Sequence, residues 1–104
     1  MTQYLLGIDN GGTMAKAALF TTDRTEVAVA SCKSEMLDVK PGWAEFDMNA
    51  VWSNAAGAVR QVIEQSGVDP SAIAGVACTG HGNGLYLVDA DANPVYNAIG
   101  SADG

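Results

Sequence analysis

Short apolar segments separated by turn-forming residues fill the first third of the chain. Residues 4–8 are almost entirely apolar, and residues 15–20 follow a turn that contains two glycines. Residues 26–30 alternate small or polar with branched apolar side chains, which is typical of a strand with one buried face. The pattern predicts three strands, the first two joined as a hairpin, because glycine supplies the backbone angles of a tight turn.

A single long helix is predicted from about residue 48. Apolar residues recur there at spacings of three and four, so one face of the helix is apolar. The residues of this face are Val51, Ala55, Ala58, Val59, Val62 and Ile63. Asp47 is suited to cap the start of the helix and Gly67 to end it, and residues 69–71 predict a short capped turn directly afterwards.

Two further apolar runs complete the predicted order. Residues 73–78 predict a buried strand, residues 85–88 predict another, and residues 89–94 predict a turn after it. The order is therefore strand-strand-strand-helix-strand-strand, which belongs to the α/β class (β-β-β-α-β-β). Residues 101–104 neither cap nor close such a fold, so we expect the chain to be a truncated part of a larger protein.

Composition narrows the classes of function. The chain carries 5 Lys and Arg against 12 Asp and Glu, a net charge of -7. This balance disfavours nucleic acids and anionic membrane surfaces as partners, because no basic patch is available to meet their phosphates. Separately, no apolar run of the sequence is long enough to span a bilayer. Cys32 and Cys78 have no motif spacing and apolar neighbours, so we expect unpaired core cysteines in a reducing cytoplasm.

The sharpest local feature is the turn that follows Asp9. Backbone N–H groups of Gly11, Gly12 and Thr13 can face one concavity and bind a phosphate. Asp9 is placed to hold a hydrated Mg²⁺ ion, and Lys16 can offset charge on a transferred phosphoryl group. The simpler alternative is an ordinary hairpin turn that needs no ligand. P-loop and Rossmann motifs do not fit, because both lead into a helix.

Other polar and aromatic residues have simpler interpretations. Glu45 and Asp47 resemble a carboxylate pair, but we favour a solvated loop acid and a helix cap. Trp52 is expected to pack in the core, whereas packing and ligand stacking are equally favoured for Trp43. His81 is the only histidine, and one histidine without a Cys/His cluster predicts no zinc site.

Four segments, taken in order, resemble motifs of one group of kinases. Residues 7–13 resemble the first phosphate motif of the actin-like ATPase and sugar kinase superfamily. Residues 41–47, Pro-Gly-Trp-Ala-Glu-Phe-Asp, resemble the Gly-Trp-x-Glu-x-Asp segment of FGGY carbohydrate kinases, which also precedes a helix carrying a Trp. Residues 79–85 and 97–104 resemble that family's sugar-contacting loop and a later segment ending in Asp. Their common order is far more specific than any one match.

The resemblance implies a fold and a site. Residues 1–104 would be the N-terminal part of a ribonuclease H-like (actin-like ATPase) domain with a mixed sheet, and the second domain would be absent. ATP and Mg²⁺ would be the cofactors, with Asp9 at the metal. The phosphates would meet Gly11, Gly12, Thr13 and Lys16, and the sugar would meet His81, Asn83 and Asp103. The catalytic base would lie beyond residue 104, so the chain alone is expected to be inactive.

The sugar itself stays open at this point. Gly12 and Lys16 stand where many family members have Thr and Arg, and the loop at residues 80–84 resembles that of kinases of L-xylulose or small polyols. The predicted activity is ATP-dependent phosphorylation of a ketopentose such as xylulose, or of a polyol. The alternative is a nucleotide-binding module of actin or chaperone type. An uncovered sheet edge also predicts self-association into a homo-oligomer.

Overall fold

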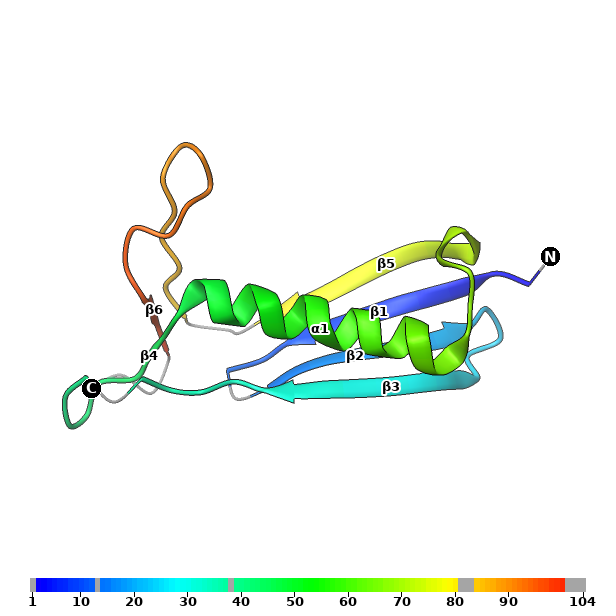
Figure 1. The fold of residues 1–104 in the computed structure, drawn as a ribbon, viewed down its shortest axis with the longest axis horizontal. Helices are drawn as coiled ribbons and strands as arrows, with labels where there is room; N and C mark the ends of the chain where they lie inside the picture. The colour runs from blue at the N-terminus through cyan, green and yellow to red at the C-terminus, as the bar shows by residue number, and fades with distance from the viewer. Residues whose placement is uncertain (1, 13, 38, 81–83, 101–104) are drawn as a thin grey trace.

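Four strands form one mixed sheet (Figure 1). The computed structural model describes residues 2–12, 14–37, 39–80 and 84–100. The strands are β1 (Tyr4–Asn10), β2 (Met14–Thr21), β3 (Glu26–Lys33) and β5 (Ile73–Gly80), in the order β3-β2-β1-β5. The first three are antiparallel neighbours and β5 runs parallel to β1. This arrangement confirms the predicted α/β class and mixed sheet.

Helix α1 (Met48–Ser66) covers one face of this sheet. Its buried residues Ala58 and Val62 join side chains of β1, β2 and β3 in one core. The sheet contributes Leu6, Ala17, Leu19 and Ala30 to that core. Alternate residues of a strand face the same side, so the small side chains of β2 let the helix approach closely. Figure 1 shows α1 running along β2 and β3, with β5 beyond them.

Both ends of α1 are capped as predicted. The Asp47 carboxylate accepts hydrogen bonds from the backbone N–H groups of Asn49 (2.9 Å) and Ala50 (3.4 Å). Gly67 has a φ of 69°, and its N–H donates to the Ile63 carbonyl at 3.0 Å. That left-handed conformation favours glycine, which explains why the helix ends there.

The short turn after the helix is also confirmed. Residues Pro70–Ala72 form a single 3₁₀ turn, η1. Asp69 caps it by accepting from the Ser71 N–H at 2.9 Å. This backbone hydrogen bond favours the ionised form and lowers the pKa of the Asp69 carboxyl below its ordinary value.

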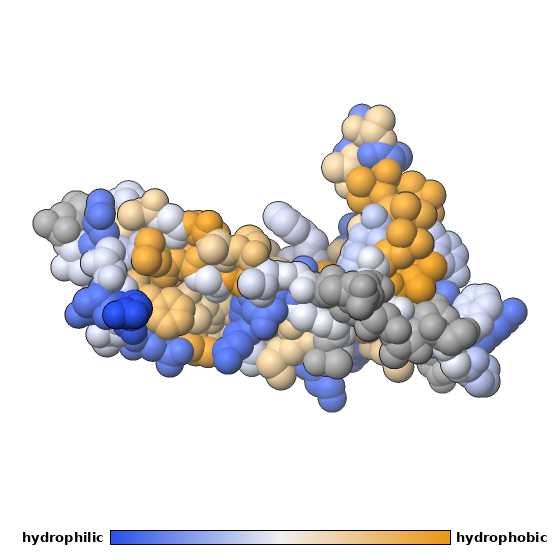
Figure 2. Space-filling view, turned by 180° about the vertical axis from the view of Figure 1, so that it is seen from behind, coloured by the Kyte–Doolittle hydropathy of each residue, from blue (hydrophilic) through white to orange (hydrophobic). Residues whose placement is uncertain are grey.

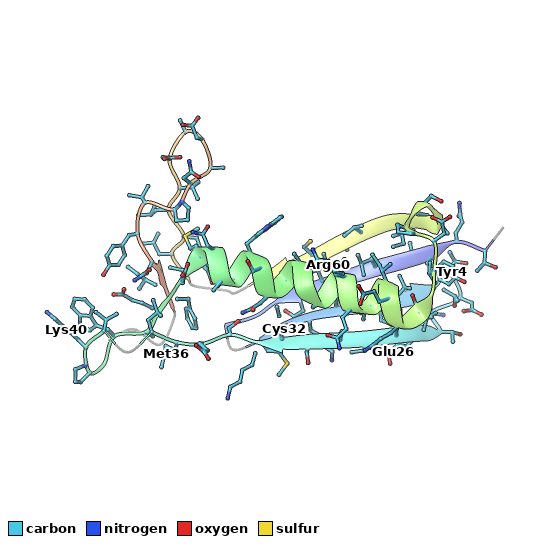
Figure 3. All side chains as sticks on the ribbon, viewed as in Figure 1. Tyr4, Glu26, Cys32, Met36, Lys40 and Arg60 are labelled. Atoms are coloured by element: carbon cyan, nitrogen blue, oxygen red, sulfur yellow. The ribbon has the colours of Figure 1, made fainter. Side chains whose placement is uncertain are left out.

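A second, small sheet lies beyond the main one and was not predicted. Strands β4 (Glu45–Phe46) and β6 (Ala98–Ile99) pair antiparallel. Figure 3 shows that the loop carrying Met36 and Lys40 lies at this end of the molecule, opposite the end that holds Tyr4 and Glu26. Two-residue strands give no periodic signal, which is why the sequence did not indicate them.

The predicted strand at residues 85–88 is wrong. Only single bridges occur there, Leu85 with Ile99 and Val88 with Pro94. The chain instead forms a projecting loop whose tip is the predicted turn. Asp89 stabilises that turn by accepting from the backbone N–H groups of Asp91 and Asn93, both at 2.9 Å.

Three predictions of burial are also wrong. Trp52 is 75% exposed and Cys78 is exposed, and Val76 in the middle of β5 is 59% exposed. The cause is the position of α1, which packs on β2 and β3 and leaves most of β5 uncovered by the described residues, although Ile73 at its start packs against the core. Cys32, by contrast, packs against the core as predicted, and neither cysteine is in a disulfide.

The cap at Asp47 gives a direct test of the helix. Replacing it with alanine leaves two backbone N–H groups without an acceptor, so Asp47→Ala should lower the free energy of unfolding by about 1 kcal/mol. Asp47→Asn retains a capping oxygen and should stay close to wild type. Urea unfolding followed by circular dichroism measures both, and equal losses for the two variants would contradict the assigned cap.

Candidate functional site

The pairing of β1 on both of its edges brings three polar side chains together. Asp9 lies opposite Lys16 on the antiparallel strand β2 and opposite Thr79 on the parallel strand β5. All three face away from α1, because they alternate with the core residues of their strands. The Thr79 hydroxyl donates to Asp9 Oδ1 at 3.1 Å. Asp9 is exposed, so its carboxylate is available to a ligand.

An open hollow of about 250 Å³ lies over this face of the sheet. Asp9, Lys16 and Thr79 provide its polar lining, and Ile8 and three small residues of β1, β2 and β5 provide the rest. Because Gly7, Ala18 and Ala77 fill little space, the polar groups remain accessible from this side. The arrangement offers a carboxylate, an ammonium and a hydroxyl to an anionic ligand accompanied by a metal ion.

The glycine turn next to this hollow closes the hairpin. Gly11 N–H donates to the Met14 carbonyl at 3.0 Å, so this amide is already used within the turn. A Cβ at Gly11 would stand 3.3 Å from the Met14 carbonyl oxygen, which is tighter than ordinary contact. Gly12 is half-buried, and Thr13 lies outside the described residues.

The three residues expected at the sugar, His81, Asn83 and Asp103, also lie outside the described residues. The residues that precede these two segments, Gly80 and Gly100, are described. β5 ends at Gly80, which pairs with Asn10 at the end of β1. Gly100 is held by its N–H, which donates to the Ala44 carbonyl at 2.7 Å.

Glu45 is a residue that sequence reasoning misjudged. It is only 2% exposed, and so the prediction of a solvated loop acid is wrong. Its Oε2 accepts from the Tyr96 hydroxyl and its Oε1 from the Asn97 side-chain amide, each at 3.1 Å. These bonds tie the segment before residue 100 to β4. A Cβ at Gly100 would approach the Phe46 ring to 2.9 Å, so this packing also requires a glycine.

The two tryptophans differ in their surroundings. Trp43 is 38% exposed. The Lys40 ammonium lies 4.8 Å from the centroid of the Trp43 ring and forms an intramolecular cation–π contact with it. Trp52 instead lines a groove of about 530 Å³ between the first turns of α1 and the projecting loop. Tyr86 lies on the loop side, and partial burial raises the pKa of its phenol above the ordinary value.

The exposed Asp9 carboxylate suits a hydrated magnesium ion. In the described ranges, no three His, Cys, Asp or Glu side chains gather at one place. Mg²⁺ commonly takes one or two carboxylates and completes its shell with water and phosphate oxygens. The exposed Asp9 carboxylate, held by Thr79, meets that requirement.

No helix in the described ranges is long and apolar enough to cross a membrane.

Comparison with known proteins decides the family. The model of the FGGY family of carbohydrate kinases, N-terminal domain, matches residues 4–104. The chain belongs to this family. The predicted family and fold class are thereby confirmed, and the four motif segments lie within the matched range.

Relatives of this FGGY chain include kinases of more than one substrate. An L-xylulose/3-keto-L-gulonate kinase of Escherichia coli K12 is 39% identical over 103 residues, which is 99% of this chain and 21% of that protein. A glycerol kinase of Burkholderia cenocepacia is 33% identical over 98 residues, covering 93% of this chain and 20% of that protein.

A solved structure supports the same fold. The crystal structure of xylulose kinase from Rhodospirillum rubrum superposes with a TM-score of 0.87 at 29% identity, covering 98% of this chain and 21% of that one. The FGGY chain described here therefore spans about a fifth of the length of the relatives it matches.

The buried Glu45 yields a second prediction. Glu45→Ala leaves two donors without their acceptor, so it should cost about 1–3 kcal/mol of stability. Glu45→Gln keeps one oxygen acceptor and should lose less. Glu64→Ala, at an exposed position of α1, is the control and should be nearly neutral. Thermal unfolding measures all three, and a Glu45→Ala variant as stable as the control would refute the role assigned to the carboxylate.

Proposed function

We propose that the enzyme carrying this chain transfers the γ-phosphoryl group of ATP to a hydroxyl of a small sugar, either a ketopentose such as xylulose or a polyol. The match to the carbohydrate kinase family over residues 4–104 carries this proposal. The polar cluster at Asp9 supports it, because a carboxylate beside a glycine turn suits magnesium and phosphate. The similarity to an L-xylulose/3-keto-L-gulonate kinase favours the ketopentose.

Each residue at the turn has a distinct proposed role. Asp9 holds the water shell of Mg²⁺, and Thr79 keeps the Asp9 carboxylate oriented. The ion, when bound with ATP, neutralises charge on the phosphate oxygens. Lys16 adds a positive charge on the same face of the sheet. Gly11, Gly12 and Thr13 are proposed to meet the phosphates, and Gly11 shapes the turn through its hydrogen bond to the Met14 carbonyl.

The sugar and the reacting hydroxyl require parts beyond this turn. His81, Asn83 and Asp103 are proposed to face the sugar. A general base must accept the proton of the attacking hydroxyl, and we expect it beyond residue 104. The 104-residue chain should therefore show no turnover alone and bind ATP only weakly. We place the complete enzyme in the cytoplasm.

Sugar-dependent release of ADP tests this function. An enzyme of full family length carrying this chain should form ADP with one ketopentose, tetritol or glycerol, and little without a sugar. A coupled assay measures ADP as each compound is supplied in turn. Equal ADP with and without every sugar would instead support an actin-type or chaperone-type module, in which ATP drives a conformational change.

We also propose that the 104-residue chain self-associates through β5. This strand stands at the end of the sheet order and exposes Val76 and Cys78. An open edge with exposed apolar residues favours pairing with another strand. Sedimentation under reducing conditions should show a mass that rises with concentration, and Val76→Lys should suppress the rise. Val95→Lys, in the projecting loop, is the control, and a monomer at every concentration would contradict the proposal.

A further inference from the structure

The small sheet joins two segments that adjoin the residues proposed at the sugar. Strand β6 pairs with β4 on one side (Figure 1). On the other side Leu85 and Ile99 exchange two backbone hydrogen bonds, each of 2.9 Å. In the sequence, Leu85 closely follows the proposed sugar residue Asn83, and β6 closely precedes Asp103. The position of β6 therefore sets where both segments leave the small sheet.

Backbone pairing alone specifies this position weakly. Strands β4 and β6 have two residues each, so few ladder hydrogen bonds oppose a change of register. A slip of one residue would move the segment by about 3.3 Å and turn its side chains to the opposite face. Another interaction is needed to hold a single register.

The projecting loop between Leu85 and β6 gives little support by packing. Its apolar side chains Leu85, Leu87, Val88 and Val95 are between 49% and 64% exposed. Figure 2 shows this loop from behind, standing out from the rest of the molecule and carrying apolar side chains on its surface. Contacts of the loop with the other described residues therefore do not fix its base.

The side chain of Glu45 supplies the missing constraint. It is 2% exposed, and its two carboxylate oxygens each accept one hydrogen bond of 3.1 Å. The donors are the Tyr96 hydroxyl and the Asn97 side-chain amide, which are the two residues directly before β6. A shifted strand would present other side chains to the carboxylate, so these two bonds select one register.

The residue after β6 requires the same register. The Gly100 N–H donates to the Ala44 carbonyl at 2.7 Å. A Cβ at this position would stand 2.9 Å from the Phe46 ring, so only glycine fits there without a shift of the ring. Strand β6 is thus held before its first residue by Glu45 and after its last residue by β4.

The chemistry of Glu45 indicates a geometric role. Burial of a carboxylate costs desolvation free energy, and apolar side chains of similar volume often give equal or greater stability at such positions. What an apolar side chain cannot do is accept two hydrogen bonds from consecutive residues. The advantage of the carboxylate here is therefore the fixed placement of the segment that starts at Tyr96.

We propose that Glu45 is a positioning residue for the sugar site of the enzyme. It acts through Tyr96 and Asn97, which hold β6, and not by contact with the sugar. This inference rests on the proposed kinase function and adds to it a residue outside the phosphate turn. Because misplacement of binding groups by about 1 Å can cost about 100-fold in rate, small shifts of β6 should be measurable.

Separate KM values for sugar and ATP test the proposal in the full-length enzyme. Glu45→Ala should raise the KM for the sugar about tenfold and leave the KM for ATP unchanged, because the phosphate turn belongs to the other sheet. Glu45→Gln, which keeps an acceptor, should recover much of the sugar affinity. Glu64→Gln, at an exposed position of α1, is the matched control and should behave as wild type. A purely structural role would lower the active fraction and kcat and leave both KM values unchanged, which would overturn the proposal.

Variants of the two donors keep the test valid if Glu45→Ala does not fold. Tyr96→Phe removes only a hydroxyl from a side chain that is 48% exposed, so it should fold normally. Combined with Asn97→Ala it should raise the sugar KM about as much as Glu45→Ala does, because both changes delete the same two hydrogen bonds. An unchanged sugar KM in the folded double variant would overturn the role of Glu45 alone. Wild-type enzyme that forms equal ADP with and without every sugar would refute the kinase function and this role with it.

Discussion

The register of β1 against its two neighbours is the constraint on which the rest of the structure depends. Leu6 and Leu19 pair across β1 and β2 and are buried under α1, so the alternation of the strand turns Asp9 to the other face. A slip of one residue would place Asp9 in the core and Leu6 in solvent. Burial of the core therefore also fixes the carboxylate beside Lys16 and Thr79. Fold and site are specified by one set of hydrophobic positions.

Local chemistry made much of the fold predictable from sequence. The alternation in β1 to β3, the apolar face of α1, the cap at Asp47 and the end at Gly67 each depend on residues a few positions apart. Features that depend on distant packing were not predictable. Trp52 was expected in the core because sequence does not show which strands α1 covers. Glu45 was misjudged because its partners Tyr96 and Asn97 lie more than 50 residues away.

The candidate site also combines features that were predictable from nearby residues with features that depend on distant packing. Asp9 and Lys16 could be placed together from sequence, because a short hairpin forces their strands to pair. The hydrogen bond from Thr79 could not, since it crosses 70 residues and depends on the parallel pairing of β5. The groove lined by Trp52 likewise requires the loop of residues 84–97 to stand beside α1. Family motifs indicated a sugar kinase, and the three-dimensional arrangement adds which polar side chains meet on the face of the sheet that is turned away from α1.

We propose that Asp9, held by Thr79, binds the metal ion that accompanies ATP. The most direct measurement is the Mg²⁺ dependence of sugar-dependent ADP release by the full-length enzyme with Thr79→Val. Loss of an orienting hydrogen bond should weaken apparent Mg²⁺ affinity by about 10–100-fold, with much of the rate restored by excess Mg²⁺. Excess Mg²⁺ should not restore the rate of the Asp9→Asn variant. The control Asp23→Asn, in an exposed turn, should behave as wild type. An unchanged Mg²⁺ dependence in both site variants would contradict the account.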